Sequence, residues 1–199
     1  MKIIFVSILT VATIGLLIPS ASADIFIHKL DPQFSIQHPN GWIIQEFPEY
    51  RGIAIDADLT GRNGMWIGLD CSTSMGEDCG FSGTPPVDYQ ELEWIKEYII
   101  DACESASYSE SYLICYNQKI IDKYVHYVDG YKAYSFLIEE TWHQDGKDPN
   151  FPDGGGAHKI LAIDTTLYVN NDIWTIFIAN DFDNFSMEQT EKILSTFKV

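Results

Sequence analysis

The stretch FSIQHPNGWIIQEF, from Phe34 to Phe47, decides how the first part of the chain folds. Apolar and polar residues alternate over its first positions, which is the period of a half-buried β-strand. Pro39 has no N–H to donate to a sheet, and Asn40-Gly41 supplies two residues that tolerate positive φ. Trp42 then restarts an apolar run. We therefore predict a strand, a tight turn and a second strand, with Trp42 as a buried anchor after the turn.

The N-terminus has the features of an export signal. A single lysine precedes a short apolar run, and small residues follow at Ala21-Ser22-Ala23. This pattern predicts a signal peptide over residues 1–23, cut after Ala23. An uncleaved membrane anchor is the alternative, but no later segment is long and apolar enough to span a bilayer. Residues 24–199 are then expected to form a single domain that works outside the cytoplasm, secreted or in the cell envelope.

The charge of the chain is strongly acidic. Its 199 residues include 12 basic and 29 acidic side chains, which gives a formal net charge of -17. Proteins bind nucleic acid by neutralising phosphates with basic residues, so we do not expect a nucleic-acid partner. The acidity is typical of a protein that must stay soluble in a salty or cation-rich exterior.

Periodicity predicts several antiparallel strands and two helices. Alternating apolar residues indicate strands at 53–59, 65–71, 112–128, 131–142, 160–169 and 173–179. Asp129-Gly130 between two such runs is a strong hairpin signal. Helical spacing is present over residues 87–103 and again near the C-terminus, where Ser186 and Gln189 fit a capping box. Two helices with six or seven antiparallel strands indicate an α+β layered domain.

Several short motifs resemble those of PsbP-like domains. FSIQHPNGW, with Pro39 and Trp42, is similar to their N-terminal signature, and DGYKAYSFLIEE places Gly130 and Ala133 as in their Gly-x-x-Ala hairpin. LYVNNDIWTIFIAND and EKILSTFKV resemble their penultimate hairpin and terminal helix. The resemblance implies the Mog/PsbP-like α/β/α sandwich, with a central antiparallel sheet of six to seven strands and helices on both faces. That family includes extrinsic subunits of photosystem II and a nuclear transport factor that binds a small GTPase.

Four cysteines in an exported chain favour disulfide bonds over free thiols. We prefer the two pairs that are close in sequence, Cys71 with Cys79 and Cys103 with Cys115. Two other connectivities remain open. A structural zinc site would need C-x-x-C spacing, which is absent.

The acidic loop after residue 144 is the best candidate for a metal site. Asp145, Asp148, Asn150 and Asp153 are hard oxygen donors of the kind that Ca²⁺ takes, and three glycines follow them. The spacing departs from an EF-hand, so we expect at most weak Ca²⁺ binding, and a solvated loop is the alternative. His143 and His158 flank the loop and could face each other to hold Zn²⁺ or Cu²⁺.

Other signals are weaker. Asn184-Phe185-Ser186 is an N-glycosylation sequon. GFSGT, at residues 80–84, nearly matches a serine-hydrolase elbow but has Thr84 where glycine belongs. Trp66 and Trp142 could stack on sugars, although burial in a covered sheet is the better interpretation.

The sequence and the resemblance together favour one function. We expect a secreted, non-enzymatic PsbP-like binding or accessory domain for an extracytoplasmic protein or envelope component, with no required cofactor. The alternatives are a weak calcium-binding or other metal-binding protein and a secreted hydrolase. The two local disulfides and the acidic loop depart from the photosystem subunit, which separates this chain from its particular role.

Overall fold

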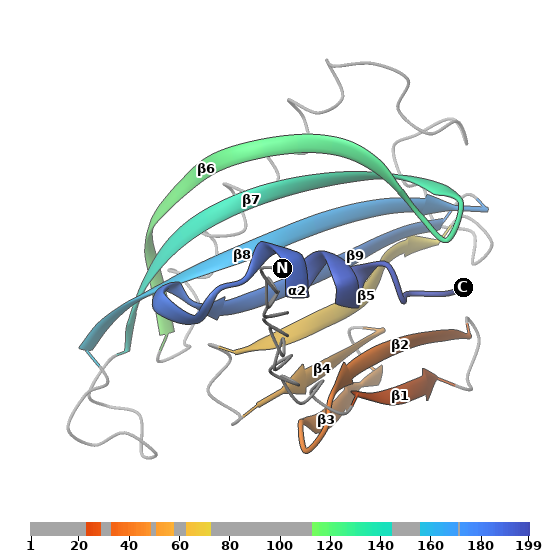
Figure 1. The fold of residues 1–199 in the computed structure, drawn as a ribbon, viewed down its shortest axis with the longest axis horizontal. Helices are drawn as coiled ribbons and strands as arrows, with labels where there is room; N and C mark the ends of the chain where they lie inside the picture. Colours follow the sequence, from red (N-terminus) through yellow and green to blue (C-terminus); the bar gives the residue numbers. More distant parts are fainter. Residues whose placement is uncertain are drawn as a thin grey trace, which may run out of the picture.

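The computed structural model describes residues 23–28, 33–48, 51–57, 63–72, 113–144, 156–170 and 172–199. The strands of this part are β1 (Ala23–His28), β2 (Phe34–Pro39), β3 (Ile43–Phe47), β4 (Gly52–Asp56), β5 (Gly64–Ser72), β6 (Leu113–Val128), β7 (Tyr131–Gln144), β8 (Gly156–Val169) and β9 (Asp172–Asp181). A 3-10 helix, η3 (Phe182–Asn184), and an α-helix, α2 (Met187–Leu194), follow them. Seven strands form an antiparallel sheet in the order β3-β4-β5-β9-β8-β7-β6, and β1 pairs with β2 in a separate two-stranded sheet (Figure 1).

The turn after β2 moves the chain from one sheet to the other. The Trp42 N–H donates to the Pro39 carbonyl at 3.4 Å, and Gly41 has a φ of +81°, which only glycine adopts without strain. The predicted strand, turn and strand are therefore confirmed. The two strands do not share a sheet, however, because β2 pairs with β1 while β3 pairs with β4 at the edge of the large sheet.

The long strands are joined by tight hairpins. Asp129 and Gly130 have φ values of +51° and +83°, the conformation of a type I′ turn, between β6 and β7. Asn170 has a φ of +51° at the β8–β9 connection. The turn at Asp129-Gly130 confirms the hairpin that the sequence predicted there. β1 is a strand that the prediction missed.

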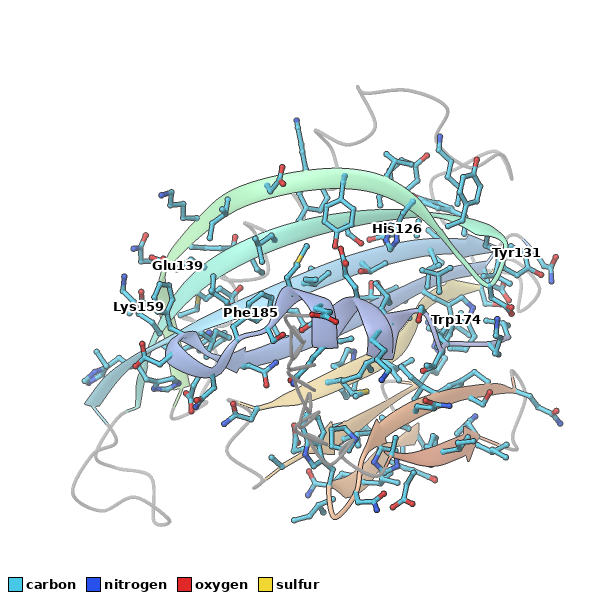
Figure 2. All side chains as sticks on the ribbon, in the orientation of Figure 1. His126, Tyr131, Glu139, Lys159, Trp174 and Phe185 are labelled. Atoms are coloured by element: carbon cyan, nitrogen blue, oxygen red, sulfur yellow. The ribbon has the colours of Figure 1, made fainter. Side chains whose placement is uncertain are left out.

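One face of the large sheet, which we call the first face, carries the main core. It packs against the two-stranded sheet and α2 (Figure 1). Its buried side chains include Ile53, Ile55, Met65, Ile67, Ala133, Leu167, Trp174, Ile176 and Ile178. Trp174, which Figure 2 labels, lies edge-on to Phe34 of β2 and Phe197 of the C-terminal tail, with ring centroids 5.4 and 5.8 Å away. This aromatic cluster joins the two sheets to the end of the chain.

Helix α2 begins as the sequence predicted. The Ser186 hydroxyl accepts a hydrogen bond from the Gln189 N–H at 3.3 Å, so Ser186 is the N-cap. Leu194 and Thr190 are the buried residues of the helix. Phe197 is also buried, but it belongs to the C-terminal tail, beyond the last residue of the helix.

Trp42 is less buried than we expected. It is partly exposed and packs against the rim of the first-face core. The reason is its place in the chain: it precedes β3, an edge strand whose residues are largely exposed. The central anchor is Trp174 instead.

The opposite, second face of the sheet has a smaller core. Its buried residues are Tyr134, Phe136, Ile138, Ile160, Ala162, Tyr168 and Ala179. Helix α2 packs on the first face. Helices on both faces are therefore not seen in the described residues, and the predicted helix at 87–103 lies outside them.

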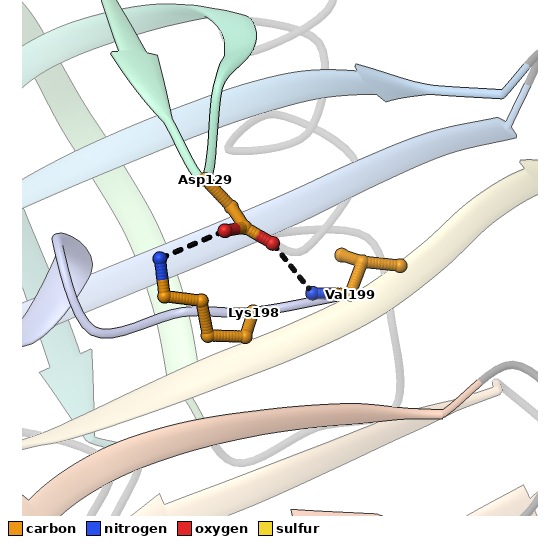
Figure 3. Close-up of polar contacts among 3 residues, drawn as sticks. All are labelled: Asp129, Lys198 and Val199. Atoms are coloured by element: carbon orange, nitrogen blue, oxygen red, sulfur yellow. Dashed lines mark hydrogen bonds and ion pairs between the residues drawn. The ribbon is translucent and has the colours of Figure 1, made fainter.

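The C-terminal tail is tied to β2 and to the β6–β7 turn. Backbone hydrogen bonds of 2.9 Å run both ways between Ser35 and Lys198. The Asp129 carboxylate accepts hydrogen bonds from the Lys198 ammonium at 2.7 Å and from the Val199 N–H at 3.1 Å (Figure 3). The hydrogen bond from Lys198 is the main reason that the pKa of Asp129 is lowered.

Replacing Asp129 with asparagine should cost roughly 0.5 to 1 kcal/mol of unfolding free energy, because the exposed ion pair with Lys198 is lost. Asparagine tolerates the left-handed backbone of Asp129, so the turn itself is preserved. A lowered native pKa adds stability that is present above the unfolded pKa and is lost as the pH falls through the native one. The difference between wild type and Asp129→Asn in urea denaturation should therefore shrink toward pH 3. An equal difference at pH 3 and pH 7 would contradict the ion pair.

Candidate functional site

A buried polar chain crosses β6, β7 and β8 on the first face. The His126 Nε2 lies 2.7 Å from the Ser135 hydroxyl, which lies 2.7 Å from the Thr165 hydroxyl (Figure 2 labels His126). Burial lowers the pKa of His126, and the carboxylate of Glu191 on α2 acts in the opposite direction. The contact between His126 and Ser135 is of the kind that a Ser-His catalytic pair makes. Ser135 is 0% exposed, however, so its hydroxyl cannot meet a substrate. The chain of hydroxyls links three strands instead.

Glu140 is a buried carboxylate on the second face. It is 4% exposed, and both of its oxygens accept hydrogen bonds: Oε1 from the Gln118 amide at 2.7 Å and Oε2 from the Trp142 indole at 2.9 Å. Burial raises the pKa of Glu140, while the two hydrogen bonds oppose that rise. Its two donors fix the side chain, which is the arrangement of a structural carboxylate.

Asp164 lies in the middle of β8 on the same face, two residues after Ala162. Burial raises its pKa to about 7, with further contributions from the charges of Asp70 and Glu140. Burial also raises the pKa of Asp70, against a hydrogen bond from the Thr175 hydroxyl. Three carboxyl groups with raised pKa values thus share the second face. In the described part of the chain, no group of three His, Cys, Asp or Glu side chains could hold a metal ion.

The Trp66 side chain lies over two glycines, Gly52 and Gly68, on the second face. Its indole lies against Gly52, and a Cβ on Gly68 would come within 2.8 Å of the indole Nε1. The Phe47 ring is 5.6 Å away between centroids. The absence of side chains at these two glycines lets the indole lie flat on β4 and β5. Trp66 is partly buried, so it is packed as we expected.

The predicted metal ligands are not brought together by what the structure describes. Asp145, Asp148, Asn150 and Asp153 lie outside the described residues. His143 pairs with Ala157, and His158 pairs with Trp142. Adjacent positions along a strand point to opposite faces, so His143 and His158 do not face each other and the prediction of a shared metal is wrong.

The structure describes only some of the remaining predicted residues. Cys115 is buried on β6, whereas Cys79 and Cys103 lie outside the described residues, so the local disulfide pairing stays a prediction. Asn184 is exposed in η3, which leaves the sequon accessible. Ala133 is fully buried on the first face, and Gly130 completes the turn before it. Both residues therefore have structural positions.

Sequence reasoning missed two features. Asp164 and the His126–Ser135–Thr165 chain became visible only with the strand register. A signal for the first was present, since Asp164 interrupts the apolar run ILAIDTTLYV in a strand that lies inside the sheet.

None of the helices in the described part of the chain is long and apolar enough to cross a bilayer. The hydroxyl chain lies on one face of the sheet, and the three carboxyl groups with raised pKa values lie on the other. They therefore do not converge on one catalytic centre.

Comparison with known proteins supports one class of fold. No known protein family matches the sequence, and no curated protein matches it. Among solved structures, the chain is similar over nearly its full length to a PsbP protein, so it has a PsbP-like fold. That neighbour is the solution structure of cyanobacterial PsbP (CyanoP) from Synechocystis sp. PCC 6803. The TM-score is 0.56 at 12% sequence identity, and the match covers 92% of this chain and 95% of the other.

Proposed function

We propose that this chain is a non-enzymatic accessory or binding domain that acts outside the cytoplasm on a protein or envelope partner. The observation that carries the proposal is the PsbP-like fold, which extends over 92% of the chain. The buried Ser135 adds support, because its hydroxyl, which lies against His126, has no access to a substrate. The signal over residues 1–23 and the mature domain from 24 to 199 are part of the same proposal.

Affinity capture from the native cell envelope tests the accessory function. The tagged mature chain, cross-linked in place, should recover one partner in a fixed ratio. The same preparation should turn over no member of a panel of chromogenic esters and glycosides. Turnover that survives purification to homogeneity would contradict the non-enzymatic function and support a secreted hydrolase.

We also propose that residues 87–103 form a helix that covers the second face. Seven hydrophobic residues of that face are buried, although α2 lies on the other side. The segment carries Leu92, Ile95 and Ile99 at helical spacing, which is the apolar stripe that such a face requires. The two helices would then complete the sandwich implied by the PsbP resemblance.

A double-mutant cycle can test this second helix. Alanine replacements of Leu92, Ile95 and Ile99 should couple to Ile138→Ala on the second face by about 0.5 to 3 kcal/mol. The same replacements combined with Ile67→Ala, on the first face, should be additive within about 0.5 kcal/mol. Equal coupling to both faces, or coupling only to Ile67, would contradict the proposed position.

The acidic loop is proposed as a weak Ca²⁺ site. If Asp145, Asp148, Asn150 and Asp153 share a cation, millimolar Ca²⁺ should raise the melting temperature by mass action. Replacing Asp148 and Asp153 with asparagine should abolish the shift, and sodium chloride of equal ionic strength should reproduce little of it. No heat in calorimetry at several millimolar Ca²⁺ would leave the segment as a solvated loop.

A further inference from the structure

The edge strands of the two sheets differ in how they are protected against pairing with another chain. β2 is covered by the C-terminal tail, through the backbone hydrogen bonds between Ser35 and Lys198. β6 has two bulges, and β3 carries Glu46 at an exposed position. β1 has no bulge, no proline and no charge at its centre, and among the strands that the structure describes only β2 pairs with it. β1 is therefore the edge that most readily accepts another strand.

β1 also exposes two large apolar side chains. Ile25 is 61% exposed and Ile27 is 58% exposed. Phe26 between them packs against the first-face core, so the two isoleucines lie on the outer face of the two-stranded sheet. Their cross-strand neighbours on β2 are Gln37 and Ser35, which are polar. In Figure 1, β1 lies at the lower margin of the molecule, and β2 lies between it and most of the large sheet.

The sequence of β1 is complementary to itself. Residues 24–28 read Asp-Ile-Phe-Ile-His, with Phe26 at the centre. When two antiparallel copies pair around Phe26, Ile25 of each copy lies opposite Ile27 of the other, and Asp24 lies opposite His28. No like charges are then opposite each other. His28 keeps its stacking on Phe34 within its own copy, with ring centroids 5.0 Å apart, because the strands pair through their backbones.

We infer that two copies of this chain associate through β1, antiparallel about Phe26, into a four-stranded sheet in the order β2-β1-β1-β2. A second copy matches the pattern of residues 24–28 by symmetry, which an unrelated strand does not. Backbone hydrogen bonds supply the attraction, and the four isoleucines cover one another on the outer face. All five residues follow the predicted cleavage after Ala23. The inference goes beyond the accessory function and does not depend on it.

The association is expected to be weak. A contact centred on five residues of each copy buries less than the roughly 1,200 Å² that a stable interface needs. The formal net charge of -17 on each copy also opposes it. We therefore expect a dissociation constant on the order of 0.1 mM, which salt should lower because it screens the repulsion between the copies.

Sedimentation velocity of the untagged mature chain tests the dimer. Between 10 µM and 1 mM, the fraction of dimer should rise, and 0.5 M sodium chloride should increase it at each concentration. Ile25→Lys and Ile27→Lys should each weaken the association about tenfold or more, because each places an ammonium against an isoleucine of the other copy. Ile121→Lys makes the same change of charge at an exposed position of β6, which is 47% exposed, and should associate as wild type does.

Mixed variants test the register. Ile25→Lys mixed with Ile27→Glu places opposite charges directly across the two strands, so these two variants should form a heterodimer more tightly than either associates with itself. Ile25→Lys mixed with Ile25→Glu places the charges on a diagonal and should associate less tightly than the first mixture. Each variant should keep the urea midpoint of wild type, because the substituted side chains are exposed.

Four results would overturn the inference. They are a chain that stays monomeric at 1 mM in 0.5 M salt, a dimer that Ile25→Lys and Ile27→Lys leave unchanged, equal weakening by Ile121→Lys, and no gain on mixing Ile25→Lys with Ile27→Glu. If Ile25→Lys with Ile25→Glu forms the tighter mixture, the strands pair in another register and the arrangement about Phe26 is wrong.

Discussion

Replacing Trp174 with alanine is expected to lower the free energy of unfolding by about 3 to 5 kcal/mol, the typical cost of deleting a buried aromatic side chain. Trp174 is 2% exposed and touches Phe34 and Phe197, so its loss opens a cavity between the two sheets and the C-terminal tail. Domains of this size have about 5 to 15 kcal/mol of total stability, so the variant should be poorly folded at 37 °C. Urea denaturation of the purified mature chain measures the loss.

Two matched variants sharpen this prediction. Trp174→Phe should cost less, because the Trp174 indole N–H has no hydrogen-bond partner in the described part of the structure and an unpaired buried donor is itself unfavourable. Trp42→Ala should also cost less, because Trp42 only lines the rim of the core. A Trp42→Ala variant that lost as much stability as Trp174→Ala would contradict the role of Trp174 as the central anchor.

Replacing Asp164 with asparagine is expected to stabilise the protein, increasingly so as the pH rises. Burial raises the native pKa of Asp164 to about 7, whereas an aspartate in the unfolded chain titrates near 4. A raised native pKa contributes stability that is complete below the unfolded pKa and is lost as the pH rises through the native one. Burial also raises the pKa values of Asp70 and Glu140, so these two carboxyl groups also lower the stability of the protein as the pH rises.

The size of this effect follows from the shift in pKa. At pH 8, Asp164→Asn should be about 2 to 4 kcal/mol more stable than wild type. Between pH 8 and pH 5 this difference in unfolding free energy should decrease by about 1 to 3 kcal/mol. Asparagine resembles the protonated carboxyl in shape, so packing changes little. Asp183→Asn, at an exposed position in η3, is the control and should show no such trend. A difference that is constant between pH 5 and pH 8, or that grows toward acid, would contradict the raised pKa of Asp164.

The sequence by itself determined the local elements and their turns. Asp129-Gly130 and Asn40-Gly41 supply residues that accept positive φ, and both form turns where the sequence placed them. Ser186 caps a helix because its hydroxyl reaches an N–H three residues on. These features depend on neighbours in the chain, so they can be predicted without knowing the fold. The PsbP resemblance added the class of fold, which the similarity to a solved PsbP structure confirms.

Only the tertiary structure decided which face each side chain occupies and how deep it lies. Trp42 and Trp174 follow similar sequence signals, but one is next to an edge strand and the other is on β9 in the middle of the sheet, so only Trp174 becomes a central anchor. The sequence did not predict β1, because this short strand of six residues is stabilised by its pairing with β2 and not by a local pattern. His143 and His158 lie at neighbouring strand positions and yet on opposite faces, which the pairing register sets. Burial, which raises the pKa of Asp164, depends on residues far away in the sequence, so the local pattern could draw attention to Asp164 but could not give the direction of its pKa shift.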